Sequence, residues 1–352
     1  MACGLKPIFV AHSSKISAMT EEWNQRMRED WDARARQDAE RNIYTRDDAD
    51  DVNDFGLSGE ANYNQLVRPY LPVLLSGREV RSCRVVEIGC GVGRMTEFLA
   101  RDFGFVDAVD VAPAMIQGAR RRLGHLPNIA FHAGRGSDLE PVEDGSADLV
   151  FSYIVFQHIP SRTVIESYVR EAARVLRDGG AFKFQVNGDQ SAAYLAHRRD
   201  TWLGETFSTG EASAMLASSG FSIISMEGAG TQYFVITARK GPVQHAGYLL
   251  PGEPWAEPFL LHGFGAAVDA SWRPMESRAR VLLEGAGSLL YVGLYFWPES
   301  CRHRLTVAGH CFEVTESGDH FFECARVGGE IELALDPAPT RAPAFRVIGL
   351  RV

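Results

Sequence analysis

A short glycine-rich run with a carboxylate before it is the segment of this sequence best suited to bind a charged ligand. Glu87 precedes the run Gly89-Cys90-Gly91-Val92-Gly93, and Arg94 follows it. Glycine lets the backbone turn tightly and lets a ligand approach with no side chain in the way. A carboxylate repels a pyrophosphate but attracts a sulfonium or an amino group. The spacing E-x-G-x-G-x-G therefore favours a zwitterionic ligand with a positive charge over a dinucleotide, whose usual motif is G-x-G-x-x-G.

Regular elements on both sides must hold this turn. Val85, Val86 and Ile88 form the apolar run expected of a strand that is covered on both faces. Residues 94–101 are predicted to form the helix that follows. The first N–H groups of a helix have no partner within the helix, so they can point toward a ligand above the turn.

A second acid follows at the end of another expected strand. Phe105–Asp110 has the pattern of a short strand, and Pro113 is suited to the first turn of the next helix. Asp110 comes 17 residues after Gly93, close to the spacing of about 20 at which an acid reaches ribose hydroxyls. The alternative is an aspartate that is solvated or caps the helix.

Four segments in order resemble the motifs of class I S-adenosylmethionine-dependent methyltransferases. The first is Val86–Thr96, and the others are Phe105–Met115, Asn128–Leu139 and Ala147–Pro160. The resemblance implies an α/β fold with a Rossmann-like, seven-stranded sheet. It also implies S-adenosyl-L-methionine as the cofactor and methyl transfer as the activity.

The same resemblance implies which residues bind the cofactor. In similar enzymes the acid at Asp110 binds the ribose, and the next residue, Val111, flanks the adenine. Many members carry an aspartate directly after the first glycine of the third motif, where this chain has Arg135. The backbone around Gly136 is expected to meet the adenine, with Asp138 either assisting or capping a turn. The full expected set is Glu87, Gly89, Cys90, Gly91, Gly93, Asp110, Val111, Met115, Gly136, Ser137, Asp138, Ser152 and Tyr153.

Methyl transfer to a hydroxyl needs an in-line arrangement and a group that takes the proton. His158 follows the strand of the fourth motif and is the candidate base, because an unperturbed histidine titrates near neutral pH. It could instead hold the substrate or cap the next helix. Gln157 is expected to hydrogen-bond the acceptor, which is expected to be a small molecule or a carbohydrate. The residues expected to line the acceptor pocket are Trp31, Tyr44, Tyr63, Phe156 and Trp202.

The chain is expected to have three parts. Residues 1–81 should form a helical lid over the cofactor mouth, with helices from Thr20 and over Ala61–Leu71; a helical cover for a sheet edge is the alternative. Residues 82–240 should form the cofactor domain. Its fifth strand is expected after a helix-stop turn at Arg177-Asp178-Gly179-Gly180.

Residues 241–352 have a different sequence pattern from the rest of the chain. Short β-like runs alternate with clusters of Gly, Pro, Ser and Asp, which indicates an all-β sandwich or jelly-roll. Six aromatic residues of this part could stack on sugars, or could simply fill its core: Phe264, Trp272, Tyr291, Tyr295, Phe296 and Trp297.

Composition limits the classes of partner. The 352 residues carry a net charge of −9, which disfavours nonspecific binding to nucleic acid or to an acidic membrane. No apolar run approaches the ~20 residues of a membrane span, and none resembles a signal peptide. The six cysteines show no C-x-x-C spacing, so no metal site is expected and a cytoplasmic location is the simpler interpretation.

Two other function classes and the oligomeric state stay open at this point. A nicotinamide-dependent oxidoreductase is disfavoured by Glu87 and Arg94. A non-catalytic protein that binds a glycan or a partner, and retains a cofactor site, is harder to exclude.

Overall fold

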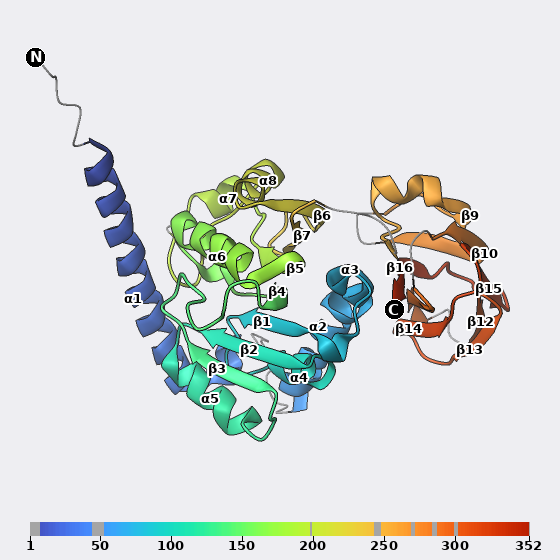
Figure 1. Ribbon diagram of the computed structural model, residues 1–352, viewed down its shortest axis with the longest axis horizontal. Coiled ribbons are helices and arrows are strands. Elements are labelled where there is room, and N and C mark those ends of the chain that lie inside the picture. The colour runs from blue at the N-terminus through green and yellow to red at the C-terminus, as the bar shows by residue number, and fades with distance from the viewer. Residues whose placement is uncertain are drawn as a thin grey trace, which may run out of the picture.

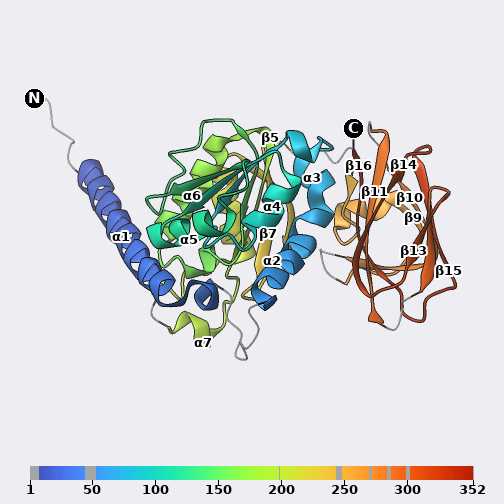
Figure 2. The same cartoon turned by 90° about the horizontal axis from the view of Figure 1, so that it is seen from below.

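The computed structural model describes residues 8–43, 53–197, 199–242, 248–268, 272–283, 287–298 and 302–351. It consists of an α/β part and a separate all-β part, which lie side by side in Figures 1 and 2. Both kinds of part were expected from the sequence, and their presence is confirmed.

The α/β part is built on a sheet of seven strands. In spatial order the strands are β3 (Ile129–Ala133), β2 (Phe105–Asp110), β1 (Arg84–Ile88), β4 (Ala147–Ser152), β5 (Leu176–Val186), β7 (Phe234–Lys240) and β6 (Phe221–Glu227). The first five are parallel to one another, and β7 is antiparallel to both neighbours. β1 and β4 are almost fully buried, as expected of parallel strands that are covered on both faces.

Helices cover both faces of this sheet. One apolar core lies under α6 (Arg162–Val175) and α8 (Thr209–Ser218). The other lies under α2 (Asn53–Leu66), α3 (Leu71–Leu75) and α4 (Thr96–Asp102). The other helices in the described part of the chain are α1 (Ile8–Ile43), α5 (Pro113–Leu123) and the short α7 (Ala192–Leu195), with 3₁₀ turns at Arg68–Tyr70, Val80–Ser82, Phe156–His158 and Pro254–Phe259.

Helix boundaries in the N-terminal part differ from the expectation. α1 begins at Ile8 rather than at Thr20, and its N-terminal half projects from the body of the molecule in both views. The second helix was expected over Ala61–Leu71 but runs from Asn53 to Leu66. Two prolines follow, and each begins a new short helix because proline fits the first turn but not the interior.

The turn expected at residues 177–180 is part of a strand. β4 pairs Ala147 with Leu176 and then Leu149 with Ala181, so four residues of β5 are opposed by one of β4. Gly179 has a φ of 74° there. The two glycines form an irregularity inside the ladder rather than a turn before it, which the dipeptide alone does not reveal.

In the described residues the all-β part contains nine strands. They are β8 (Tyr248–Leu249), β9 (Leu260–Phe264), β10 (Arg273–Leu282), β11 (Leu289–Phe296), β12 (His303–Val307), β13 (His310–Val314), β14 (Gly318–Ala325), β15 (Glu330–Asp336) and β16 (Ala344–Arg351). β10 pairs with β16 near its start and with β15 near its end, so it joins two groups of strands around one apolar core.

The two parts share apolar packing. Tyr291 and Val347 of the all-β part belong to the same buried cluster as Tyr70 of the 3₁₀ turn before α3. The hydroxyl of Tyr291 donates to the carbonyl of Arg68 at 2.7 Å. Tyr291 thus packs at the junction and is not available to stack on a sugar.

Two more of the six aromatic residues fill the all-β core. Phe296 is fully buried, and Phe264 stacks on Phe345 with 5.2 Å between ring centres. Core packing therefore explains these two. The other three, Trp272, Tyr295 and Trp297, are partly exposed and contact one another.

Candidate functional site

A cavity of about 420 Å³ lies at the carboxyl ends of the central strands. It is bordered by the turn after β1, the end of β2 and the segment after β4, with α1 along one side. Open α/β sheets bind their ligands at this edge. The cavity brings together the segments that the sequence singled out.

The turn after β1 needs glycine where it approaches the rest of the cavity wall. Gly89 and Gly91 have φ values of 74° and 55°. A Cβ atom on Gly89 would lie 2.3 Å from a methyl carbon of Val155, and a Cβ atom on Gly91 would lie 3.1 Å from Ile43 of α1. The glycines therefore allow both the left-handed backbone and the close packing.

Glu87 presents a buried carboxylate beside this turn. The side chain is 5% exposed, and the Thr96 hydroxyl donates to it at 2.5 Å. Burial raises the pKa of Glu87 to about 7, while Thr96 and the nearby Arg94 oppose the increase and Asp110 adds to it. A cationic ligand group would favour the ionised form of this carboxyl.

Asp110 holds the turn and also faces the cavity. The N–H groups of Gly91 and Ala112 each donate to one of its oxygens at 2.9 Å. Burial raises its pKa to about 6, against the effect of those hydrogen bonds. Each carboxylate oxygen accepts more than one hydrogen bond, so Asp110 keeps capacity for ribose hydroxyls.

Arg94 is a cavity residue that was not among the expected binding residues. It is 6% exposed and lines the cavity with its charged side chain. It donates to the Asn62 side chain of α2 at 2.6 Å. Its place directly after the last glycine was the available signal, and it puts a cation next to Glu87.

The adenine side of the expected site is only partly present in the cavity wall. Val111, Met115 and Gly136 line the cavity, whereas Ser137 and Asp138 do not. The Ser137 hydroxyl accepts from Asn24 of α1 at 2.7 Å. Asp138 accepts from the N–H of Glu140 at 3.3 Å and caps a turn, which is the alternative that the sequence left open.

Aromatic and amide side chains form the other end of the cavity. Trp31 of α1, His158 and Trp202 contact one another, with ring centres 5.2–6.3 Å apart. The residues there that sequence reasoning missed are Asn42, Ile154, Val155, Asn187, Tyr194, Gln232 and Tyr233. Asn42 lies in α1, Tyr194 lies in α7 and the others lie in loops. Ile154 and Val155 belong to the fourth motif, but only the fold places these residues together at the cavity.

His158 is held in one protonation state. Its Nδ1 lies 2.7 Å from the Trp202 carbonyl, and its Nε2 lies 3.1 Å from the amide nitrogen of Gln157. Burial lowers the pKa of His158 to about 4; the Trp202 hydrogen bond and Asp200 oppose this decrease, and Arg34 adds to it. The imidazole is therefore neutral at neutral pH, with a lone pair on one of its ring nitrogens.

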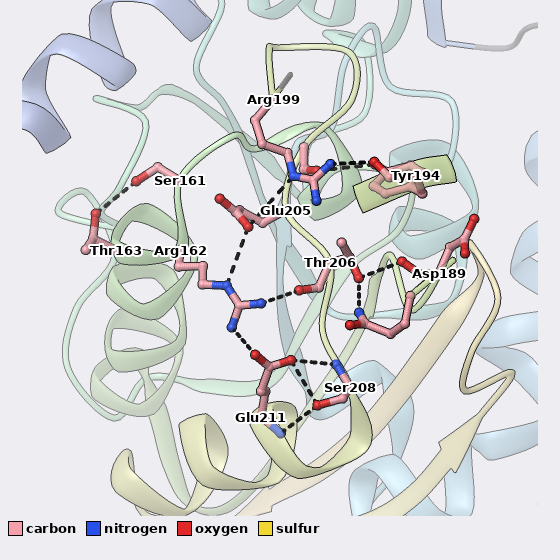
Figure 3. A network of polar contacts seen from close by, with 12 residues as sticks. Ser161, Arg162, Thr163, Asp189, Tyr194, Arg199, Glu205, Thr206, Ser208 and Glu211 are labelled. Carbon is pink, nitrogen blue, oxygen red and sulfur yellow. Dashed lines mark hydrogen bonds and ion pairs between the residues drawn. The ribbon is translucent and has the colours of Figure 1, made fainter. Parts of the chain in front are cut away.

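The segment that carries Tyr194 and Trp202 is fixed by a polar network, shown in Figure 3. Arg162 of α6 donates to the Glu211 carboxylate and to the Thr206 carbonyl, each at 2.7 Å, and lies 3.4 Å from the carboxylate of Glu205. Since α6 packs on the sheet, this network ties the Trp202 end of the cavity to the core.

Several other expected site residues support the cavity from outside its wall. Tyr63 is fully buried between α2 and α4, and its hydroxyl donates to Asp102 at 2.6 Å. Phe156 is also fully buried, against Tyr168, Phe182 and Phe184. Both expectations of a substrate contact are corrected, because these rings are used in core packing.

Three further expected site residues lie outside the cavity wall or outside the described residues. The Ser152 hydroxyl donates to the Ile88 carbonyl at 3.0 Å and ties β4 to β1. Gly93 packs near Leu123 of α5, outside the cavity wall. Tyr44 lies outside the described residues.

In the described ranges, no group of three or more His, Cys, Asp and Glu side chains could hold a metal ion. No helix in that part of the chain is long and apolar enough to cross a membrane.

Comparison with known proteins identifies the central segment. Residues 86–184 match the family model described as a methyltransferase domain. The chain is 32% identical over 120 residues to the ubiquinone biosynthesis O-methyltransferase of Xanthomonas oryzae pv. oryzae (strain PXO99A), covering 34% of this chain and 49% of that protein. It is 31% identical over 125 residues to the trans-aconitate 2-methyltransferase of Methylobacterium nodulans, covering 35% and 45%. The chain thus spans about half the length of the curated relatives it matches.

Sequence identity to solved structures is lower. Geranyl diphosphate C-methyltransferase from Streptomyces coelicolor A3(2) aligns with a TM-score of 0.45 at 15% identity, covering 62% of this chain and 98% of that one. A SAM-dependent methyltransferase from Aquifex aeolicus aligns with a TM-score of 0.40 at 18% identity, covering 54% and 98%.

Proposed function

We propose that this protein transfers a methyl group from S-adenosyl-L-methionine to a hydroxyl of a small-molecule or carbohydrate acceptor. The observation that carries the proposal is the buried carboxylate pair, Glu87 and Asp110, beside the glycine turn of the segment that matches a methyltransferase domain. A buried carboxylate at this place disfavours the pyrophosphate of a nicotinamide cofactor.

The residues of the cavity fit the parts of this cofactor. Glu87 suits its positively charged groups, and Arg94 suits the carboxylate of its methionine part. Asp110 offers acceptors for the ribose hydroxyls. Val111 and Met115 supply apolar surface for the adenine. Opposite charges on Glu87 and Arg94 match a zwitterion better than they match a net anion.

When bound, the cofactor supplies a methyl group that is already activated on a positively charged sulfur. The protein must hold the acceptor in line and take its proton. Neutral His158 is the proposed proton acceptor, with Nε2 as the nitrogen that has a lone pair. Gln157 is the proposed hydrogen-bond partner of the acceptor, and Trp31 and Trp202 are the proposed apolar walls that exclude water.

The names of the relatives support a small acceptor and an oxygen atom, because they include an O-methyltransferase and a trans-aconitate methyltransferase. We also keep the division into residues 1–81, 82–240 and 241–352 as functional units. In this scheme α1 acts as a lid, and the all-β part is a sandwich.

A transfer assay tests this function. The protein is incubated with S-adenosylmethionine carrying a labelled methyl group and a panel of phenols, polyols and sugars, and label in the acceptor is counted. Transfer to at least one hydroxylated acceptor is expected. Cofactor binding without transfer to any of them would favour the non-catalytic alternative, and stabilisation by NAD instead would favour the oxidoreductase.

A further inference from the structure

Three glutamine side chains from separate segments meet at the acceptor end of the cavity. Gln157 follows β4, Gln185 lies in β5 and Gln232 precedes β7. Gln185 is fully buried. Its amide nitrogen lies 3.0 Å from the side-chain oxygen of Gln157, 2.6 Å from the carbonyl of Gln232 and 3.0 Å from the carbonyl of Val186.

The orientation of the Gln185 amide follows from its partners. Its side-chain oxygen accepts from the N–H of Ile154 at 3.0 Å. The opposite orientation would place an NH₂ group against that N–H, and an oxygen against three other oxygens. Donors do not bond donors, and acceptors do not bond acceptors. Only one orientation therefore satisfies the Gln185 side chain.

The same reasoning fixes the next two groups. The Trp202 carbonyl only accepts, so Nδ1 of His158 must carry a hydrogen. The oxygen of Gln157 accepts from the amides of Gln185 and Gln232, the latter at 3.3 Å. Its NH₂ group must then donate to Nε2 of His158. Each donor in this series of hydrogen bonds has an acceptor only when His158 is neutral, with its hydrogen on Nδ1.

The surroundings of His158 agree with that state. Trp31 and Arg34 face it from α1, and Trp202 and Asp200 face it from the segment after α7. The Arg34 guanidinium lies 4.6 Å from the centre of the Trp31 ring and 5.5 Å from that of Trp202. Arg34 disfavours an imidazolium and Asp200 favours one, while burial lowers the pKa of His158 to about 4.

Gln185 also holds a strained residue of the cavity wall. Ile154 has a φ of 55°, a conformation that is unfavourable for a β-branched side chain. Residues in such conformations persist where the surrounding structure holds them, and they cluster at functional sites. The hydrogen bond from Ile154 to Gln185 is one such restraint.

We propose that Gln185 is a positioning residue that fixes the orientation of the Gln157 amide, so that an amide N–H faces Nε2 of His158 and keeps the ring neutral until the hydroxyl of an acceptor replaces it. Only the last clause rests on the proposed function. The protonation state of His158 can be measured without cofactor or acceptor, so failure here and failure of methyl transfer are distinguishable.

The test is nitrogen-15 NMR of the histidine rings across a pH titration, on the whole chain. Disappearance of one set of signals in His158→Gln identifies His158. Wild-type protein is expected to show the Nδ1–H tautomer and a midpoint near pH 4. In Gln185→Glu the carboxylate cannot donate to Gln157, so that amide turns its NH₂ toward residue 185. Its oxygen then faces Nε2, which favours the doubly protonated ring, and the midpoint should rise past the ordinary value of about 6.5.

One control variant and one uncharged variant accompany Gln185→Glu. Gln117→Glu, an exposed change on α5, should leave the His158 signals unchanged. Gln185→Met, which adds no charge, frees the Gln157 amide to turn its oxygen toward Nε2, so the His158 midpoint should rise in this variant too, even if the glutamate variant fails to fold. An Nε2–H tautomer in the wild type, or unchanged His158 signals in a folded Gln185 variant, would overturn the proposal. With an identified acceptor, Gln185→Met should lower kcat while the KM for S-adenosylmethionine stays the same.

Discussion

The hydroxyl of Thr96 donates a 2.5 Å hydrogen bond to the carboxylate of Glu87, at the point where β1 enters the glycine turn. Thr96 is the first residue of α4 and is itself fully buried. This contact links the strand and the helix on either side of the turn. The Glu87 carboxyl, whose pKa is raised, therefore has the Thr96 hydroxyl on one side and the cavity on the other.

Glu87→Gln is expected to stabilise the ligand-free protein at pH 8 and to weaken cofactor binding. The folded-state pKa of Glu87 is raised to about 7, so the folded state binds more protons than the unfolded state between about pH 4.5 and 7. Stability therefore falls as the pH rises through this window, by up to about 3 kcal/mol. Glutamine removes the buried charge and keeps an oxygen for Thr96.

The measurement is thermal unfolding of both proteins at pH 5 and pH 8. The variant should unfold at a higher temperature than the wild type at pH 8, with a smaller difference at pH 5. Glu97→Gln changes a 42% exposed carboxylate of α4. This control variant should not show the dependence on pH. An equal difference in unfolding temperature at both pH values would contradict the burial of an ionisable Glu87.

Asp110→Ala and Asp138→Ala separate the two acids that the sequence placed at the cofactor. Only Asp110 lines the cavity. Removing its carboxylate should weaken binding of S-adenosylhomocysteine by roughly 1–3 kcal/mol, because ribose hydroxyls would lose their acceptor. Asp138 caps a turn outside the cavity, so its removal should leave the affinity near normal. Calorimetry measures the affinity of both variants. Equal losses of affinity would contradict a cavity wall that includes Asp110 and excludes Asp138.

His158→Ala should lower turnover by about 10²–10⁴-fold, the usual contribution of a positioned base. It should leave the affinity for S-adenosylhomocysteine near normal, since His158 lies at the other end of the cavity. His197→Ala is the matched control, because His197 also bonds a backbone carbonyl at 2.7 Å but is exposed and outside the cavity wall. Unchanged turnover with an identified acceptor would remove His158 from the chemistry.

Arg162→Met should loosen the segment that carries Tyr194 and Trp202. Arg162 makes charge-assisted contacts with Glu205 and Glu211, and partly exposed ion pairs contribute about 0.2–1 kcal/mol each. We expect a higher KM for the acceptor and an unchanged affinity for the cofactor. Arg170→Met, an exposed change on the same helix, should alter neither constant. A weaker cofactor affinity in Arg162→Met would mean that the network supports the whole cavity rather than its acceptor end.

The cofactor end of the site was largely predictable from the sequence. Val85, Val86 and Ile88 mark a buried strand, and the glycine spacing after them marks the turn. Local patterns of this kind depend on neighbouring residues, so they can be recognised without the fold. Asp110 was predictable for the same reason, because it ends a strand at a suitable distance from the turn.

The acceptor end was much less predictable. Gln157, Gln185 and Gln232 are far apart in the chain and meet only because β4, β5 and β7 are neighbours in the sheet. Tyr63 and Phe156 were misplaced for a related reason. An aromatic residue next to a motif has the same sequence pattern whether its ring faces a cavity or the core, and here both rings are fully buried.

The most direct test of the central claim is a calorimetric titration of the whole protein with S-adenosylhomocysteine. The account predicts saturable binding that Asp110→Ala weakens and Asp138→Ala does not. The absence of any binding heat, together with no thermal stabilisation by either S-adenosylhomocysteine or S-adenosylmethionine, would contradict it.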